Sequence, residues 1–310
     1  MKKNKTWYYL DTCAIISLDD KLLENRIKKN CFFSSFTIIE LCRNINEKTY
    51  SRQKRLLDII AESGIAIDWQ RKKAIISEYM FRTPLKGNTF HRNDKPARVL
   101  FDIVKESTSY SDYLALKNQN SIKIFLDEFT PREFRNIYKK NPEFKKKFKK
   151  KAIDCIDIVL NDTSRNSDDI TIQLLDGVKE RHPAEGYDNF IDYFKANYRT
   201  LNQYLIGSYA DYIADHFEYT GEKRNKIYKN YNNKAGIYNT TLVYYLLEHA
   251  YNNEEIKKHD GLDIDHLLFI LKPNTIIVSS DNDLLSLIET TDQGYCLHLN
   301  EFELLMGLID

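Results

Sequence analysis

Short apolar runs alternate with segments of helical periodicity at both ends of this chain. Runs dense in apolar, aromatic and β-branched residues predict buried strands at residues 7–10, 31–34, 65–67, 275–279 and 295–299. Apolar residues at helical spacing predict helices at residues 12–18, 37–45, 52–61, 263–271, 284–288 and 301–308. Because strands that alternate with helices form parallel sheets, the predicted fold class is α/β, a parallel sheet flanked by helices.

The middle of the chain is polar, Tyr-rich and helical in pattern from about residue 70 to residue 250. Further helices are predicted at residues 114–129, 152–160, 190–198, 201–217 and 238–250, and irregular segments at residues 83–95, 161–169 and 221–236. We therefore expect one discontinuous domain, residues 1–68 with residues 255–310, that carries a large, mostly helical insertion at residues 69–254. Three roles are open for the insertion: substrate binding, regulation and oligomerisation.

Composition narrows the class of protein. Hydrophobic residues make up 42% of the 310 residues, which is enough for a packed core. The 46 basic and 45 acidic residues leave a net charge of +1, which neither demands a nucleic-acid partner nor excludes one, because charge can be segregated locally. The five cysteines include no CxxC pair, and no apolar stretch reaches the ~18–20 residues of a membrane span. These features predict a cytoplasmic protein with reduced thiols and no membrane contact.

Four acidic residues stand at the ends of apolar runs or close to them. They are Asp11 after the first strand, Glu40 in the helix after the second strand, Asp265 at the start of an apolar helix and Asp281 after the strand at residues 275–279. Carboxylates at the carboxyl ends of parallel strands converge on one crevice. There they repel one another unless a hard divalent cation lies between them, and oxygen ligands suit Mg²⁺ or Mn²⁺. The pattern predicts metal-dependent chemistry on phosphates.

Four motifs, in order along the chain, carry a resemblance to a known family. They are Leu10-Asp11-Thr12, Ser35-Phe36-Thr37-Ile38-Ile39-Glu40-Leu41, Asp263-Ile264-Asp265-His266-Leu267-Leu268 and Ser279-Ser280-Asp281-Asn282-Asp283. Together they resemble the PIN-domain nucleases over roughly residues 5–60 and 255–310. The chain departs from that family in its insertion, which puts Asp265 225 residues after Glu40, and in Cys13, where many members carry Asn.

The resemblance implies a PIN-like, Mg²⁺- or Mn²⁺-dependent endoribonuclease that cleaves single-stranded RNA with a metal-activated water. The implied catalytic residues are Asp11, Glu40, Asp265 and Asp281, and the implied metal ligands are Asp11, Asp265, Asp281 and Asp283. Asp263 competes with Asp265 for the third position, and we prefer Asp265 because it directly opens the apolar run, whereas Asp263 suits a helix cap. Members of the family often serve as toxins or as effectors of antiviral defence, so an antitoxin or a defence-system partner is a further option.

A basic run offers a surface for nucleic acid. It contains Lys145, Lys146, Lys147, Lys149 and Lys150, interleaved with aromatic residues that can stack on bases. A solvated amphipathic helix with Phe144 and Phe148 toward the core explains the same pattern, and both interpretations stay open. Ser279 and Ser280 are candidates to contact a phosphate or the carboxylates. His266 is expected to be a surface or packing residue.

Two other functions compete with the ribonuclease. A structure-specific DNA nuclease uses similar carboxylates, but this chain lacks the Gly-rich turns of a DNA-binding helix–hairpin–helix. The second is a non-catalytic PIN scaffold that binds RNA or protein. The presence of all four carboxylates argues against it, because clustered acidic side chains are unfavourable without a metal. The residues alone decide neither RNA over DNA nor the oligomeric state, and a homo-oligomer is also open.

Overall fold

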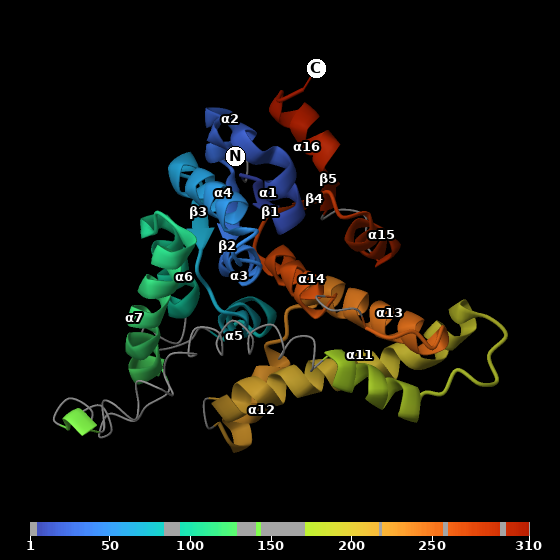
Figure 1. Cartoon of the computed structure of the whole chain (residues 1–310). Coiled ribbons are helices and arrows are strands. Elements are labelled where there is room, and N and C mark those ends of the chain that lie inside the picture. Colours follow the sequence, from blue (N-terminus) through green and yellow to red (C-terminus); the bar gives the residue numbers. More distant parts are fainter. Residues whose placement is uncertain are drawn as a thin grey trace.

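A five-stranded sheet lies at the centre of the computed structural model, which describes residues 5–83, 94–128, 141–143, 171–216, 219–256, 260–291 and 296–309 (Figure 1). The strands are β1 (Trp7–Leu10), β2 (Cys31–Ser34), β3 (Ala66–Asp68), β4 (Thr275–Ser279) and β5 (Cys296–His298). They lie in the order β3-β2-β1-β4-β5, and each neighbouring pair is parallel. The predicted α/β class with a parallel sheet is confirmed.

The two ends of the chain meet at the middle of this sheet. Tyr8 of β1 is in register with Cys31 of β2 on one side and with Ile276 of β4 on the other. From β1 the chain continues outward through β2 and β3, and it returns on the opposite side of β1 to form β4 and β5. In parallel sheets, ligands bind outside the carboxyl ends of the strands at such a reversal of strand order. The carboxyl edge between β1 and β4 is therefore the expected place for a site.

One face of the sheet is covered by helices from the first part of the chain together with the last helix. These are α1 (Thr12–Leu18), η1 (Asp19–Leu23), α2 (Asn25–Lys28), α3 (Ser35–Arg43), α4 (Tyr50–Ser63), α6 (Lys95–Glu106), α7 (Tyr110–Glu128) and α16 (Leu299–Met306). Leu10 and Val278 contribute to the core on this side, whereas Tyr9 and Ile277 belong to the core on the other side. This alternation follows from the two-residue period of a strand.

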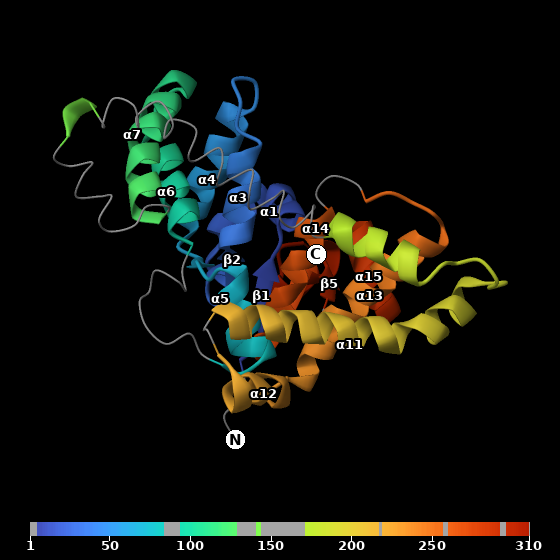
Figure 2. The same cartoon turned by 90° about the horizontal axis from the view of Figure 1, so that it is seen from below.

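The opposite face is covered mainly by helices from the later part of the chain. These are α5 (Lys72–Ile75), the π-helical turn η2 (Ile76–Met80), α11 (Phe190–His216), α12 (Gly221–Lys229), η4 (Asn233–Ala235), α13 (Gly236–Tyr251), α14 (Asp260–His266), η5 (Leu267–Leu271) and α15 (Asn282–Thr291). Residues 171–181 are also helical. Figure 2 shows α11 and α13 side by side on this side of the sheet. The described helices of the predicted insertion thus share both hydrophobic cores with the sheet.

Two predictions for the middle of the chain were wrong. The two helices predicted at residues 190–198 and 201–217 are one helix over residues 190–216, α11, because Thr200 between them is no helix breaker. Residues 221–236 are not irregular throughout. Residues 221–229 form α12, whose Lys, Glu and Arg residues favour helix and whose Ile227 is buried, and residues 233–235 form the short η4. The helix predicted at residues 152–160 and the irregular segment at residues 161–169 lie outside the described residues. Within the described ranges, every helix is too short or too polar to cross a membrane.

Candidate functional site

A pocket of about 180 Å³ opens at the carboxyl edge of the sheet, where β1 and β4 end. Its lining residues are Asp11, Thr12, Cys13, Glu40, Arg43, Asn44, Asp263, His266, Asp281 and Leu284. Four of them are carboxylates, and each comes from a different part of the chain. The fold therefore gathers acidic side chains at the place where the reversal of strand order predicts a ligand site.

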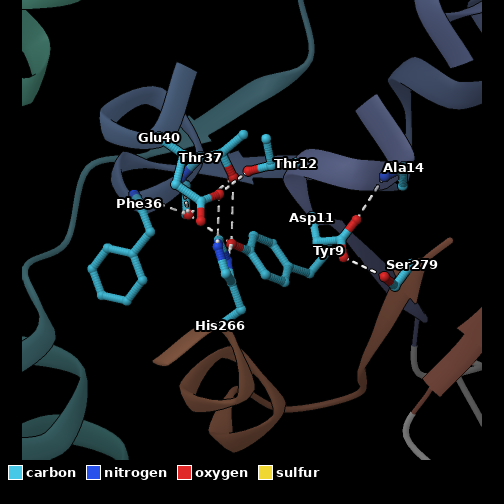
Figure 3. A network of polar contacts seen from close by, with 10 residues as sticks. Tyr9, Asp11, Thr12, Ala14, Phe36, Thr37, Glu40, His266 and Ser279 are labelled. Atoms are coloured by element: carbon cyan, nitrogen blue, oxygen red, sulfur yellow. Dashed lines mark hydrogen bonds and ion pairs between the residues drawn. The ribbon is translucent and has the colours of Figure 1, made fainter. Parts of the chain in front are cut away.

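Asp11 is fixed by two hydrogen bonds and is only 4% exposed. Its Oδ1 accepts from the backbone N–H of Ala14 at 2.7 Å, so that Asp11 caps α1, and its Oδ2 accepts from the hydroxyl of Ser279 (Figure 3). Burial raises the pKa of Asp11 to about 6, against the opposing effect of these two hydrogen bonds. Burial therefore makes ionisation of Asp11 less favourable than in water, although a pKa of about 6 leaves the group mostly ionised at neutral pH.

Glu40 and His266 form a pair inside the pocket. The Nε2 atom of His266 lies 3.1 Å from Oε2 of Glu40, and the same Oε2 accepts from the hydroxyl of Thr12 (Figure 3). Burial by itself would lower the pKa of His266, but the carboxylates of Glu40, Asp11 and Asp263 outweigh it and raise the pKa to about 9. A pKa of about 9 favours the protonated ring at neutral pH. His266 is buried rather than on the surface, and it lies at the pocket beside Glu40.

The carboxylate that α14 brings to the pocket lining is Asp263, whereas the preferred Asp265 lies outside that lining. Residues two apart on a helix project about 200° from each other, so Asp263 and Asp265 of α14 cannot share one direction. Asp263 lines the pocket, where burial and then the nearby Glu40 raise its pKa to about 7. Asp265 is buried on another side, with its Oδ1 2.7 Å from Nζ of Lys72 and 3.5 Å from the hydroxyl of Tyr238.

Asp281 lines the pocket as expected, but Asp283 does not. The Oδ1 atom of Asp281 accepts from the backbone N–H groups of Asp283 at 2.9 Å and Leu284 at 3.1 Å, which places Asp281 at the start of α15. The side chain of Asp283 is exposed in the first turn of that helix. The position predicted as a further metal ligand thus lies outside the pocket lining.

The residues predicted to contact nucleic acid lie in different environments. Ser279 is fully buried, and its hydroxyl donates to Asp11 and accepts from the backbone N–H of Asp281. It therefore holds the two carboxylate residues and, in this position, cannot contact a phosphate. Ser280 is partly exposed, and its hydroxyl lies 3.3 Å from that of Ser17. Lys145, Lys146, Lys147, Lys149 and Lys150 lie outside the described residues.

Sequence reasoning missed several residues of the pocket. Arg43 follows Glu40 by three residues on α3 and Asn44 ends that helix, so helical spacing from Glu40 was a signal for Arg43. The same spacing joins Asp263 to His266 on α14. Cys13, where many PIN-domain members carry Asn, is exposed at the pocket. The protein around its sulfur excludes part of the water, and this and the nearby carboxylates raise the pKa of Cys13 to about 12, which disfavours a nucleophilic thiolate at neutral pH.

The side chains are not arranged as a ready metal site. Among the described residues, no group of three or more His, Cys, Asp or Glu side chains is placed so that it could hold a metal ion. Comparisons of the chain with models of protein families, with curated proteins and with solved structures gave no match. The functional interpretation therefore rests on the residues of the pocket and their geometry.

Proposed function

We propose that this protein is a Mg²⁺- or Mn²⁺-dependent phosphodiesterase of PIN-like fold that cleaves single-stranded RNA. The observation that carries the proposal is the meeting of four carboxylates, Asp11, Glu40, Asp263 and Asp281, in one pocket at the carboxyl edge of a parallel sheet. The choice of RNA as substrate, and a role as a toxin or defence effector with a partner protein, rest on the motif resemblance.

The donor set of the pocket fits a hard divalent cation. Asp11, Asp263 and Asp281 would hold the ion, since all three offer oxygen ligands of the kind that Mg²⁺ and Mn²⁺ prefer. Burial raises the pKa of Asp11 to about 6 and, together with the nearby Glu40, the pKa of Asp263 to about 7, and a bound cation would offset this by stabilising the ionised forms. When bound, the ion supplies a polarised water and positive charge against the phosphate. Binding requires the carboxylates to draw together from the positions seen here.

Other residues of the pocket have separate tasks in this proposal. Glu40, held by Thr12 and His266, would accept a proton from the attacking water or orient that water. Arg43 also lines the pocket, and its guanidinium would pair with a phosphate oxygen of the substrate. The neighbouring Asn44 offers amide hydrogen bonds to the sugar–phosphate backbone.

The test of the proposal is cleavage of an end-labelled single-stranded RNA by the purified protein with Mn²⁺. Cleavage is expected to disappear with EDTA and in Asp281→Asn, and a DNA strand of the same sequence is expected to stay intact. Asp283→Asn is the matched control, since Asp283 lies two residues away but outside the pocket lining. Cleavage that survives in Asp281→Asn, or no cleavage by the wild-type protein, would contradict the proposal.

One observation favours a second function, a non-catalytic scaffold that binds RNA or protein. His266 provides a positive charge beside Glu40 from within the protein, so part of the acidic charge is compensated without an ion. Thermal unfolding with and without Mn²⁺ separates the two functions. The phosphodiesterase predicts a higher melting temperature with Mn²⁺, and the scaffold predicts no change.

A further inference from the structure

His266 is held from both sides of its ring, although nothing in the sequence motifs gives it a role. It is 2% exposed at the end of α14, between the end of β1 and the helix α3 (Figure 3). Its Nε2 contacts Glu40 at 3.1 Å, and its Nδ1 contacts the hydroxyl of Tyr9. Each ring nitrogen therefore has a defined partner.

The hydrogen bond to Glu40 has only one direction. An ionised carboxylate accepts and cannot donate, so the Nε2–H of His266 is the donor in either protonation state of the ring. On the other side, the Tyr9 hydroxyl either donates to Nδ1 or accepts from it. That hydroxyl is fully buried and also lies 2.7 Å from Ser34 Oγ and 3.4 Å from Thr37 Oγ1, so its position is fixed as well.

Packing of aromatic rings restricts His266 further. The ring of Tyr9 lies 5.7 Å from the imidazole, at an angle of 29° between the two planes, and the ring of Phe36 lies 6.0 Å away at 70°. One neighbour is thus stacked on the imidazole and the other presents its edge to it. A ring enclosed in this way cannot turn without moving Tyr9 or Phe36.

The carboxylate of Glu40 is held in one orientation by this arrangement. Two donors, the Thr12 hydroxyl and His266 Nε2–H, converge on the same atom, Oε2. The side chain of Glu40 is 14% exposed at the pocket, and two converging donors restrict its rotation there. A Glu side chain otherwise has three rotatable bonds and loses considerable freedom when it is fixed.

We infer that His266 is a positioning residue that holds Glu40 in its working orientation, with Tyr9 as the anchor behind it. This inference rests on the proposed phosphodiesterase activity and deepens it. A group that orients a catalytic carboxylate acts on the chemical step more than on substrate binding, so its loss lowers kcat and leaves KM nearly unchanged.

Three variants measured by single-turnover cleavage of the labelled RNA test this inference. His266→Leu is expected to lower the rate about 10- to 100-fold, the usual effect of removing a group that orients a ligand or catalytic residue, with KM within about threefold of wild type. His266→Gln, whose side-chain amide can reach Glu40, is expected to recover most of that loss. Tyr9→Phe keeps the ring packing and removes the anchor, so a smaller loss of about 3- to 10-fold is expected.

The outcomes are distinct. His249→Leu is the matched control, because His249 on α13 contacts Tyr245 and Glu254 outside the pocket lining, and it is expected to cleave at the wild-type rate. If the wild-type protein cleaves the RNA and His266→Leu cleaves it at the same rate, the inference is overturned but the proposed function is not. The same holds if His266→Gln cleaves no faster than a folded His266→Leu. If circular dichroism shows His266→Leu unfolded, the rates of His266→Gln and Tyr9→Phe decide. No cleavage by the wild-type protein overturns the proposed function and this inference together.

Discussion

Asp263→Asn is expected to make the metal-free protein more stable at pH 8, although it removes a carboxylate from the pocket. The pKa of Asp263 rises from its ordinary 3.8 to about 7, because the group is buried and stands near Glu40. At about 1.4 kcal/mol per pH unit, the ionised form opposes folding by about 4 kcal/mol above pH 7. Contact with water and relaxation of neighbouring groups weaken this, so we expect a gain in the free energy of unfolding of about 2 kcal/mol.

The pH dependence of this gain follows from proton binding. A carboxyl group with a raised folded-state pKa contributes stability that is complete below its unfolded pKa of 3.8 and is lost as the pH rises through about 7. Asn stays neutral throughout, so the advantage of Asp263→Asn is largest at pH 8 and shrinks toward pH 4. Loss of the interaction between Asp263 and the first turn of α14 takes away less than about 1 kcal/mol.

Urea unfolding in EDTA at pH 5 and pH 8 measures both quantities. Asp265→Asn is the control with the opposite sign: Lys72 loses its ionised partner, and because Lys72 is partly exposed we expect a destabilisation of about 2 kcal/mol. Lower stability of Asp263→Asn at pH 8, or unchanged stability of Asp265→Asn, would refute the assignment of these two residues to different environments.

One substitution and one alkylation reaction test the environment of two further residues at or next to the pocket, Ser279 and Cys13. Ser279→Ala is expected to lower the free energy of unfolding by about 1–3 kcal/mol at pH 8, since the buried Asp11 loses a hydrogen-bond donor; a urea midpoint equal to that of wild type would argue against this. Cys13 is expected to react with iodoacetamide at pH 7.5 at least ~100-fold more slowly than free cysteine, because its pKa is raised to about 12, and peptide mapping by mass spectrometry would expose a normal rate.

The sheet could be predicted from sequence because its strands are short, apolar and placed at the two ends of the chain. The runs at residues 7–10, 31–34 and 275–279 have the bounds of β1, β2 and β4, and each is followed by a residue or helix that reaches the pocket. Asp11, Glu40 and Asp281 were found for that reason. The end of a parallel strand fixes where the next residue lies, almost independently of the rest of the fold.

The direction of side chains on α14 could not be predicted in the same way. The sequence predicted a helix at residues 263–271 in which Asp265 directly opens the apolar run and Asp263 suits the cap. The helix α14 begins at Asp260, so Asp263 and Asp265 both lie within it and point to different sides. Which side faces the pocket is set by tertiary contacts, in particular by Lys72 and Tyr238, which lie on α5 and α13 of the predicted insertion. Burial of Ser279 likewise depends on the neighbouring elements, which the local sequence does not specify.

The central claim is that the pocket carboxylates bind a divalent cation, and isothermal titration calorimetry with Mn²⁺ tests it most directly. The wild-type protein and Asp283→Asn are expected to bind Mn²⁺ with similar affinity, because Asp283 lies outside the pocket lining. Asp281→Asn is expected to lose most of the binding, because it removes one of the three proposed ligands. No heat of binding in the wild-type protein, or equal losses in Asp281→Asn and Asp283→Asn, would contradict the claim.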